Sequence, residues 1–388
     1  MARWGMLVLA LLLVAAPVHA KDTVVIYTAI EPEQITDYMK AVNKTLPNIE
    51  VKMLRLSTGD ISARFMAEKD NMQADLIWGV AATNMMIFKN AGLLEPYAPK
   101  GLDRVQPLFR DKGAAPAWVG IDIYMSAFCF NTEVAKKKNL PKPESWADLT
   151  KPVYKGEIVM PNPASSGTGY LSVATILQRV KEAEGWKYLD ALDKNMAEYT
   201  KSGSKPCKDA AAGERAIGVS FEYVAAKMKK DGAPVEMVIP KEGSGYEIEA
   251  NGLTKKGKSN AAAKQFLDWA ITDEAMALYS KYFAAVAVAG FPVPEGLPKE
   301  GSGYEFEANG LTKKAKGNAA AKQFLDWAIT DEAMGLYSKY FAAVAVPGFP
   351  VPEGLPKDVT KVVYPNDFDW SAKNRERILA EWAKRYQK

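Results

Sequence analysis

The sequence predicts an α/β fold made of two Rossmann-like lobes that are joined by a hinge of two crossings. Its 388 residues, of which 48% are hydrophobic and 25% charged, describe a globular chain large enough for two domains. Between residues 23 and 91, three short apolar runs alternate with segments of helical spacing, which is typical of a parallel sheet covered by helices. A single β-like run at 118–130 is long enough to cross from one lobe to the other.

The chain opens with a segment that is typical of a secretory signal peptide. Arg3 precedes an apolar run over residues 6–17, so we expect cleavage after Ala20 and export to the periplasm. The run is shorter than the roughly 20 apolar residues that span a bilayer. His19 is the only histidine, and the mature chain therefore has no imidazole for a Ser-His-Asp triad or a His-ligated metal site.

The first lobe is expected to begin with residues 21–118. Three apolar, β-branched runs predict buried strands at 23–27, 49–56 and 74–78. Helical spacing follows each of them, at 33–46, 61–69 and 84–91. Because strand, turn and helix follow one another three times, we expect the strands to pair in parallel.

The second lobe is expected over residues 119–225, beginning with the crossing strand. Its remaining pattern predicts strands at 157–160 and 216–221 and helices at 170–182 and 185–200. We expect the chain to cross back near residues 222–226. Residues 226–388 then return to the first lobe and end in C-terminal helices.

An internal repeat occupies much of the C-terminal third. Residues 241–298 recur as 299–356 with five mismatches, and each copy carries one strand-like run and two amphipathic helices. Two copies are too few for a solenoid, which needs at least three. We therefore interpret the repeat as a tandem duplication in which one copy fills the native position and the other packs outside it or extends a sheet edge.

Charge and cysteine content limit the partners of the mature chain. The net charge is +4 for the full chain, or +3 once Arg3 leaves with the leader, and the lysines are scattered, so we expect no nucleic-acid partner. We also expect a monomer. Cys129 and Cys207 are the two cysteines, and an exported protein folds where disulfides persist. The spacing leaves a disulfide and two buried thiols equally open.

Two hydroxyl-rich turns are candidate anion sites. Ser57-Thr58-Gly59 and the turn around Ser165, Ser166 and Thr168 each follow a strand and open a helix, where hydroxyls and unpaired N–H groups meet a ligand at the sheet edge. Ordinary helix caps are the alternative interpretation. The glycine pattern matches neither a P-loop nor a dinucleotide fingerprint, so no nucleotide or other cofactor is expected.

Acidic and aromatic residues near the expected crossings are the second group of candidates. Tyr27, Asp122, Tyr124, Glu222 and Tyr223 supply carboxylates that balance an ammonium group and rings that close over a carbon chain. Tyrosine and carboxylate oxygens also suit a ferric ion. Surface ion pairs and hinge packing are the alternative.

Several short motifs together resemble the type II periplasmic solute-binding proteins of ABC transporters, and in particular their 2-aminoethylphosphonate-binding branch, which is related to ferric-iron binders. These motifs are Tyr27-Thr28-Ala29, Ser57-Thr58-Gly59, residues 74–79, 162–169 and 202–208, and Asn366-Asp367-Phe368-Asp369-Trp370. The resemblance implies two lobes that close on a ligand and present it to a permease.

By that resemblance, Ser57, Thr58, Ser165, Ser166 and Thr168 hold the phosphonate oxygens. The amine faces Asp122, Glu222 or Tyr223, and the candidate site also includes Tyr27, Thr28 and Gly59. Iron binders of this group show adjacent tyrosines where this chain has Phe221-Glu222-Tyr223. This departure favours a zwitterionic phosphonate over Fe(III).

The leading hypothesis is therefore a non-enzymatic binding protein for 2-aminoethylphosphonate or a similar small anion or zwitterion. Fe(III) capture through tyrosinate oxygens is a second hypothesis of the same class. An exported hydrolase that uses serine and lysine is the hypothesis from another class.

Overall fold

The computed structural model describes residues 21–283, 285–288, 290–291, 363–364 and 366–387, together with five isolated positions between 323 and 333. The expected signal peptide, residues 1–20, lies outside the described residues. None of the helices in the described part of the chain is both long enough and apolar enough to cross a membrane.

The first lobe begins with strands and helices in strict alternation. They are β1 (Asp22–Thr28), α1 (Pro32–Thr45), β2 (Ile49–Arg55), α2 (Thr58–Ala67), β3 (Leu76–Ala81), α3 (Ala82–Asn90) and β4 (Leu94–Glu95). Two 3-10 turns follow at Leu102–Arg104 and Pro107–Phe109. The expected strands and helices of this lobe are confirmed, with ends that differ by a few residues.

The middle of the chain builds the second lobe after one long strand. Its elements are β5 (Val119–Asn131), α4 (Thr132–Lys138), β6 (Ile158–Pro161), α5 (Gly167–Arg179), α6 (Glu182–Asp193), β7 (Met196–Thr200), α7 (Lys205–Ala211), β8 (Ile217–Phe221), α8 (Glu222–Lys230) and β9 (Val235–Val238), with 3-10 turns at Ala147–Thr150 and Pro152–Tyr154. The helix expected at 185–200 ends early, because residues 196–200 pair in parallel with β6. Tertiary pairing here overrides helical spacing.

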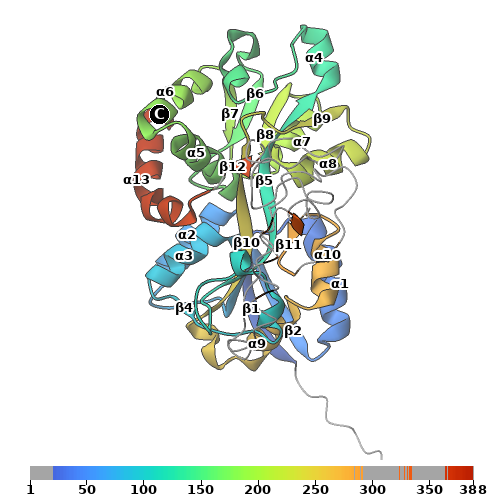
Figure 1. Cartoon of the computed structure of the whole chain (residues 1–388), viewed down its shortest axis with the longest axis vertical. Helices are drawn as coiled ribbons and strands as arrows, with labels where there is room; N and C mark the ends of the chain where they lie inside the picture. Colours follow the sequence, from blue (N-terminus) through green and yellow to red (C-terminus); the bar gives the residue numbers. More distant parts are fainter. Residues whose placement is uncertain are drawn as a thin grey trace, which may run out of the picture.

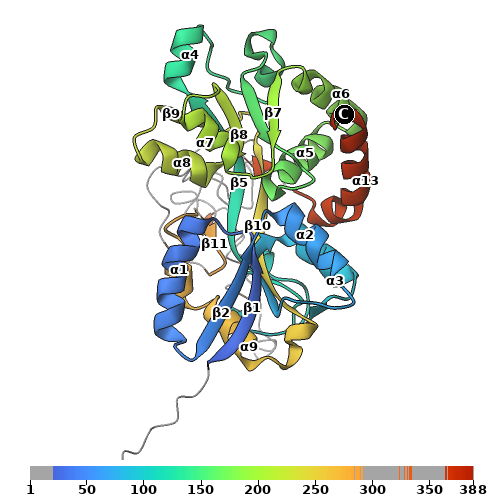
Figure 2. The same cartoon turned by 180° about the vertical axis from the view of Figure 1, so that it is seen from behind.

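The last described elements return to the first lobe and then to the second. They are β10 (Ser244–Thr254), a 3-10 turn at Lys256–Ser259, α9 (Ala261–Trp269), α10 (Asp273–Tyr279), β11 (Ala285–Val286), β12 (Val363–Tyr364) and α13 (Phe368–Tyr386). Helix α13 buries Ile378 and Trp382 in the core of the second lobe, and it stands beside α5 and α6 in both views (Figures 1 and 2).

The strands follow the order β2-β1-β3-β10-β5-β8-β6-β7, and the two long strands of this path form the hinge. Residues 119–125 of β5 pair with β10 in the first lobe, whereas residues 126–131 pair with β8 and β9 in the second. Strand β10 runs antiparallel to both β3 and β5. The return crossing expected near residues 222–226 therefore lies further along the chain, in β10, and α8 and β9 stay with the second lobe (Figure 1).

Each lobe has its own hydrophobic core. The first core surrounds Trp78 between helices α1, α9 and α10, and the second surrounds Trp146 and Phe128. Both parts are mixed α/β structures joined by β5 and β10. The fold class expected from the sequence, two α/β lobes with a two-crossing hinge, is confirmed.

The first repeat copy supplies β10, α9, α10 and β11, whereas the second copy lies outside the described residues apart from isolated positions. Two of the mismatches fall at tight places. A Cβ at Gly257 would lie 2.0 Å from the carbonyl oxygen of Asp75, and the second copy has Ala315 there. Ile248 is fully buried against Gly120, and the second copy has Phe306 there. The first copy thus fits its position better than the second would.

Cys129 and Cys207 form a disulfide between β5 and α7, with their Cα atoms 5.3 Å apart. Of the two states that the sequence left open, the structure has the bridged one. The bridge closes a loop of 78 residues, and removing such a bridge typically costs about 2–5 kcal/mol of stability. It ties the second-lobe end of β5 to α7.

Candidate functional site

A pocket lies between the two lobes, beside the hinge. Its empty space is about 440 Å³ when the part open to solvent is included. The lining residues are Ala29, Glu31, Gln34, Arg55, Ser57, Thr58, Tyr124, Ser166, Gly167, Thr168, Gly203, Phe221 and Glu249. They come from both lobes and from both hinge strands, so a ligand held there would contact both lobes and the hinge.

Two helix starts deliver hydroxyl groups to the pocket, one from each lobe. Ser57 and Thr58 begin α2, and Ser166 and Thr168 begin α5. The Ser166 Oγ accepts a hydrogen bond from the Gly169 N–H at 3.2 Å and keeps its proton available for donation. Within the described part of the chain, no hydrogen bond engages the side-chain hydroxyls of Ser57, Thr58 and Thr168. Four hydroxyls and two positive helix ends therefore converge on one volume, which suits an anion.

Glycines let these turns approach each other closely. A Cβ at Gly59 would lie 2.0 Å from the carbonyl oxygen of Ala164, across the gap between the lobes, and the Gly59 N–H donates to the Ser165 carbonyl at 2.8 Å. A Cβ at Gly203 would lie 2.6 Å from the Thr168 Oγ1. Larger side chains at either position would fill the space that the hydroxyls occupy or hold the lobes apart.

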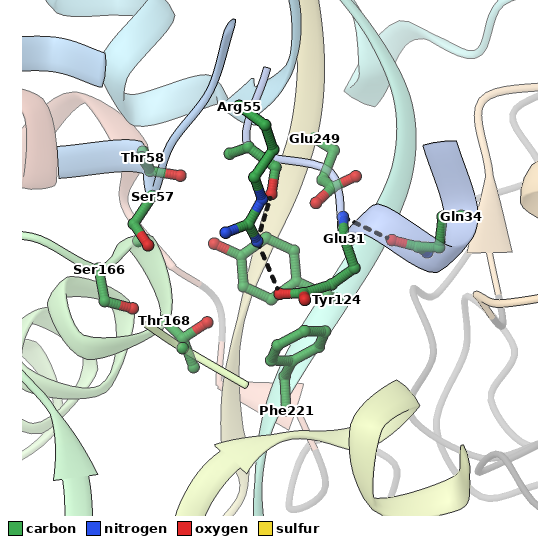
Figure 3. A pocket seen from close by; sticks show the side chains of 13 residues that line it. Glu31, Gln34, Arg55, Ser57, Thr58, Tyr124, Ser166, Thr168, Phe221 and Glu249 are labelled. Atoms are coloured by element: carbon green, nitrogen blue, oxygen red, sulfur yellow. Dashed lines mark hydrogen bonds and ion pairs between the residues drawn. The ribbon is translucent and has the colours of Figure 1, made fainter. Parts of the chain in front are cut away.

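The remainder of the pocket carries charge of both signs (Figure 3). Arg55 lies at the end of β2, donates to the Ile30 carbonyl at 3.1 Å and pairs with Glu31 at 3.0 Å. In Figure 3 the four hydroxyl side chains lie on one side of Arg55, and Glu31 and Glu249 lie on the other. Tyr124 and Phe221 add apolar surface, with ring centroids 5.7 Å apart. One end of the pocket therefore favours an anion and the other a cation.

Four carboxyl groups lie in or against the hinge strands. Asp122 stands opposite Glu249 in the β5–β10 ladder and is fully buried. Burial, with a smaller contribution from neighbouring Glu249 and Glu222, raises the pKa of Asp122 well above its ordinary value. Burial also raises the pKa of Glu222 to about 8, that of Glu249 to about 8 and that of Glu247 to about 7. The hinge thus holds carboxyl groups that keep protons near neutral pH.

Four of the residues expected at the site line the pocket. They are Ser57, Thr58, Ser166 and Thr168. Gly59 and Ser165 sit where the lobes touch, but the Ser165 hydroxyl donates to the carbonyl of Lys201 at 3.0 Å and is not among the lining groups. The resemblance placed Ser165 on the anion, and the structure instead turns its hydroxyl toward the main chain.

The other expected residues lie behind the pocket wall. The Tyr27 hydroxyl donates to Glu68 at 2.8 Å, and the Thr28 hydroxyl accepts from the Ile30 N–H. Glu222 accepts from the Met125 N–H at 2.7 Å. Tyr223 packs its ring edge-on against Tyr282, 5.3 Å between centroids. None of these side chains, nor that of Asp122, is among the lining residues, because each is used inside the hinge or a core.

Several lining residues were not in the expected site, among them Arg55, Glu31, Gln34, Gly203, Phe221 and Glu249. Arg55 ends a strand two residues before Ser57, so the rule that pointed to the hydroxyls would also have found it. Glu249 faces Asp122 across the hinge, and this cross-strand register has no signature in a single sequence.

Comparisons with known proteins agree with this arrangement. A family model described as bacterial extracellular solute-binding protein matches residues 71–332. An uncharacterized protein of Haemophilus influenzae is 32% identical over 315 residues, 79% of this chain and 91% of that protein. A probable ABC transporter periplasmic-binding protein, y4fP of Sinorhizobium fredii, is 26% identical over 332 residues, 82% of this chain and 85% of that protein.

A solved structure has the same fold. The periplasmic binding protein AfuA from Actinobacillus pleuropneumoniae, with exogenous fructose-6-phosphate bound, is 25% identical and superposes with a TM-score of 0.71, covering 94% of this chain and 98% of that one. Family match, fold and interlobe pocket lead to the same assignment. The chain belongs to the bacterial extracellular solute-binding proteins, the periplasmic ligand-capturing components of ABC importers.

Proposed function

We propose that this protein captures 2-aminoethylphosphonate, or a similar small phosphonate, by closing its two lobes and then delivers it to an ABC permease. The observation that carries the proposal is the convergence of Ser57 and Thr58 from one lobe with Ser166 and Thr168 from the other. A phosphonate group offers three oxygens, so it accepts hydrogen bonds from both lobes at once. A ligand that bridges the lobes in this way stabilises the closed state over the open one.

The chemistry of the pocket supports a phosphorus oxyanion in particular. Hydroxyls and helix-start N–H groups hold tetrahedral oxyanions without a metal. The related protein AfuA carries fructose-6-phosphate, itself a phosphate ester. The carboxyl groups of Glu31 and Glu249 at the far end favour a ligand that also bears a positive charge, which a plain sugar phosphate lacks.

The two other hypotheses from the sequence have less support. Tyr124 is the single tyrosine among the described lining residues, whereas a tyrosinate iron site uses at least two by the resemblance to iron binders. No lysine is among the pocket-lining residues that the structure describes, so a serine and lysine hydrolase has no paired groups there. We propose no chemical step.

Calorimetric titration of the mature protein tests the proposal. The ligands are 2-aminoethylphosphonate, inorganic phosphate, fructose-6-phosphate and ferric citrate. We expect saturable binding of the aminophosphonate at least tenfold tighter than that of inorganic phosphate. Tighter binding of fructose-6-phosphate than of 2-aminoethylphosphonate would indicate that the substrate is a sugar phosphate. A visible colour with ferric citrate would favour the iron hypothesis. If none of the four ligands produced a binding heat, all of these substrate assignments would be rejected.

A further inference from the structure

The hinge carries two neighbouring carboxyl groups whose oxygens lack donors. In the antiparallel ladder of β5 and β10, Asp122 stands directly opposite Glu249. Both carboxyl oxygens of Asp122 and the Oε2 of Glu249 are buried, and none of the three forms a hydrogen bond with a described residue. Glu249 also lines the interlobe pocket, whereas Asp122 lies behind it. Three buried carboxyl oxygens at the wall of the pocket therefore lack donors among the described residues.

The groups around the pair supply no cation to complete it. Glu249 faces Glu31 from the start of α1 and Glu222 from the start of α8. Arg55 is the cation that acts on Glu249, and Glu31 already holds its Nη2 at 3.0 Å; Glu31 also pairs with Lys208 at 3.6 Å. Around Asp122 lie three phenols, Tyr38 from α1, Tyr279 from α10 and Tyr124 from β5. Burial, with a smaller contribution from the neighbouring acids, raises the pKa of each of them. An acidic environment with one occupied arginine disfavours two carboxylates side by side.

We propose that Glu249, backed by Asp122, is the subsite for a primary ammonium group on the ligand, and that binding releases the proton that Glu249 carries in the empty protein. The inference rests on the proposed function, because it assumes that the anionic end of the same ligand lies at the hydroxyl cluster of Ser57, Thr58, Ser166 and Thr168. It replaces the expectation that Glu222 or Tyr223 receives the amine.

The proton balance of this step is simple. In the empty protein both carboxyls stay protonated, since burial raises the pKa of each and two adjacent charges of the same sign repel each other. The incoming ammonium keeps its own three protons and provides the missing opposite charge. The Glu249 proton then leaves to solvent, and the site ends with one carboxylate next to one ammonium, while Asp122 keeps its own proton. The raised pKa of about 8 for Glu249 agrees with this order of events.

The same geometry links the proton to lobe closure. Strands β5 and β10 are the two crossings, and Asp122 and Glu249 face each other on them. An ammonium bound at Glu249 therefore contacts a strand that connects the two lobes. The amine end of the ligand thus contributes to closure as well as to specificity.

The test compares 2-aminoethylphosphonate with ethylphosphonate, which has the same anionic end and no amine. Titrations at pH 7 in two buffers of different ionisation enthalpy count the protons released, and the difference between the ligands removes the contribution of the phosphonate itself. We expect the wild type to prefer the amine at least tenfold and to release more protons with it. In Glu249→Gln the preference should fall below threefold and the extra release should vanish, while ethylphosphonate still binds.

Retained ethylphosphonate binding shows that the variant is folded and that the anion site works. Equal affinity of the two ligands for the wild type would overturn the inference but leave the proposed function intact. An unchanged amine preference in Glu249→Gln would also overturn it. Binding of neither ligand to the wild type would reject the proposed function, and the ammonium subsite with it.

Discussion

Replacing Ser57 and Thr168 together by alanine is expected to weaken the binding of 2-aminoethylphosphonate at least a hundredfold. The two hydroxyls come from opposite lobes, and neither makes a hydrogen bond with another described side chain or main-chain group. Each hydrogen bond to a charged group contributes about 1.5–3 kcal/mol. Two of them amount to about 3–6 kcal/mol, and about 1.4 kcal/mol corresponds to a tenfold change in the dissociation constant.

These two positions separate ligand binding from folding. Ser166 is less suitable for substitution, because its Oγ accepts the Gly169 N–H and caps α5, a contact that contributes about 1 kcal/mol to helix stability. Ser165→Ala is the matched control, since that hydroxyl lies in the same turn but donates to the Lys201 carbonyl. Calorimetry should show the control within threefold of the wild type. An affinity of the double variant within threefold of the wild type would refute the assignment of the hydroxyls.

The remaining predictions concern closure, pH and the repeat. Gly59→Ala places a Cβ 2.0 Å from the Ala164 carbonyl oxygen, so we expect at least a tenfold loss of affinity with little change in melting temperature; unchanged affinity would show that the lobes close without this contact. Because burial raises the pKa of Glu222 from its usual 4.5 to about 8, its contribution to stability is complete below pH 4.5 and is lost as the pH rises toward 8. Glu222→Gln should therefore reduce the decline in urea stability between pH 5 and pH 8 by a few kcal/mol at most, and an identical decline in variant and wild type would contradict this. Deleting residues 299–356 should preserve both the melting temperature and ligand binding. Deleting residues 241–298 instead puts alanine and phenylalanine where the fold has a tightly packed glycine and isoleucine, and should lower the melting temperature. A lower melting temperature for the first deletion than for the second would show that the second copy fits better.

The alternation of strands and helices in the first lobe was predictable because its connections are short and local. Residues 22–90 form three successive units of one strand and one helix, and each unit begins with an apolar run that is recognisable in the sequence. The return crossing was harder. Strand β10 lies in the repeated segment and inserts between β3 and β5, both of which are far from β10 in the sequence. Only the tertiary arrangement shows that this strand, and not residues 222–226, bridges the lobes.

The hydroxyl-rich half of the candidate site, which would bind an anion, could be predicted for a similar reason. The hydroxyls of Ser57 and Ser166 begin helices that follow strands, and such helix starts collect at one edge of a parallel sheet. The acidic half, which would bind a cation, could not be predicted. Asp122 and Glu249 lie on the same face of the sheet because they stand opposite each other in the β5–β10 ladder. A shift of one residue in that register would exchange the two faces, and the sequence of a single chain does not specify it.

The central claim is that hydroxyls from both lobes hold the phosphonate group of one ligand in the interlobe pocket. A crystal structure of the mature protein grown with 2-aminoethylphosphonate tests it most directly. We expect phosphonate oxygens within hydrogen-bonding distance of the hydroxyls of Ser57 and Thr168, with the amine toward Glu249. A ligand bound outside this pocket, or held by one lobe alone, would contradict the account.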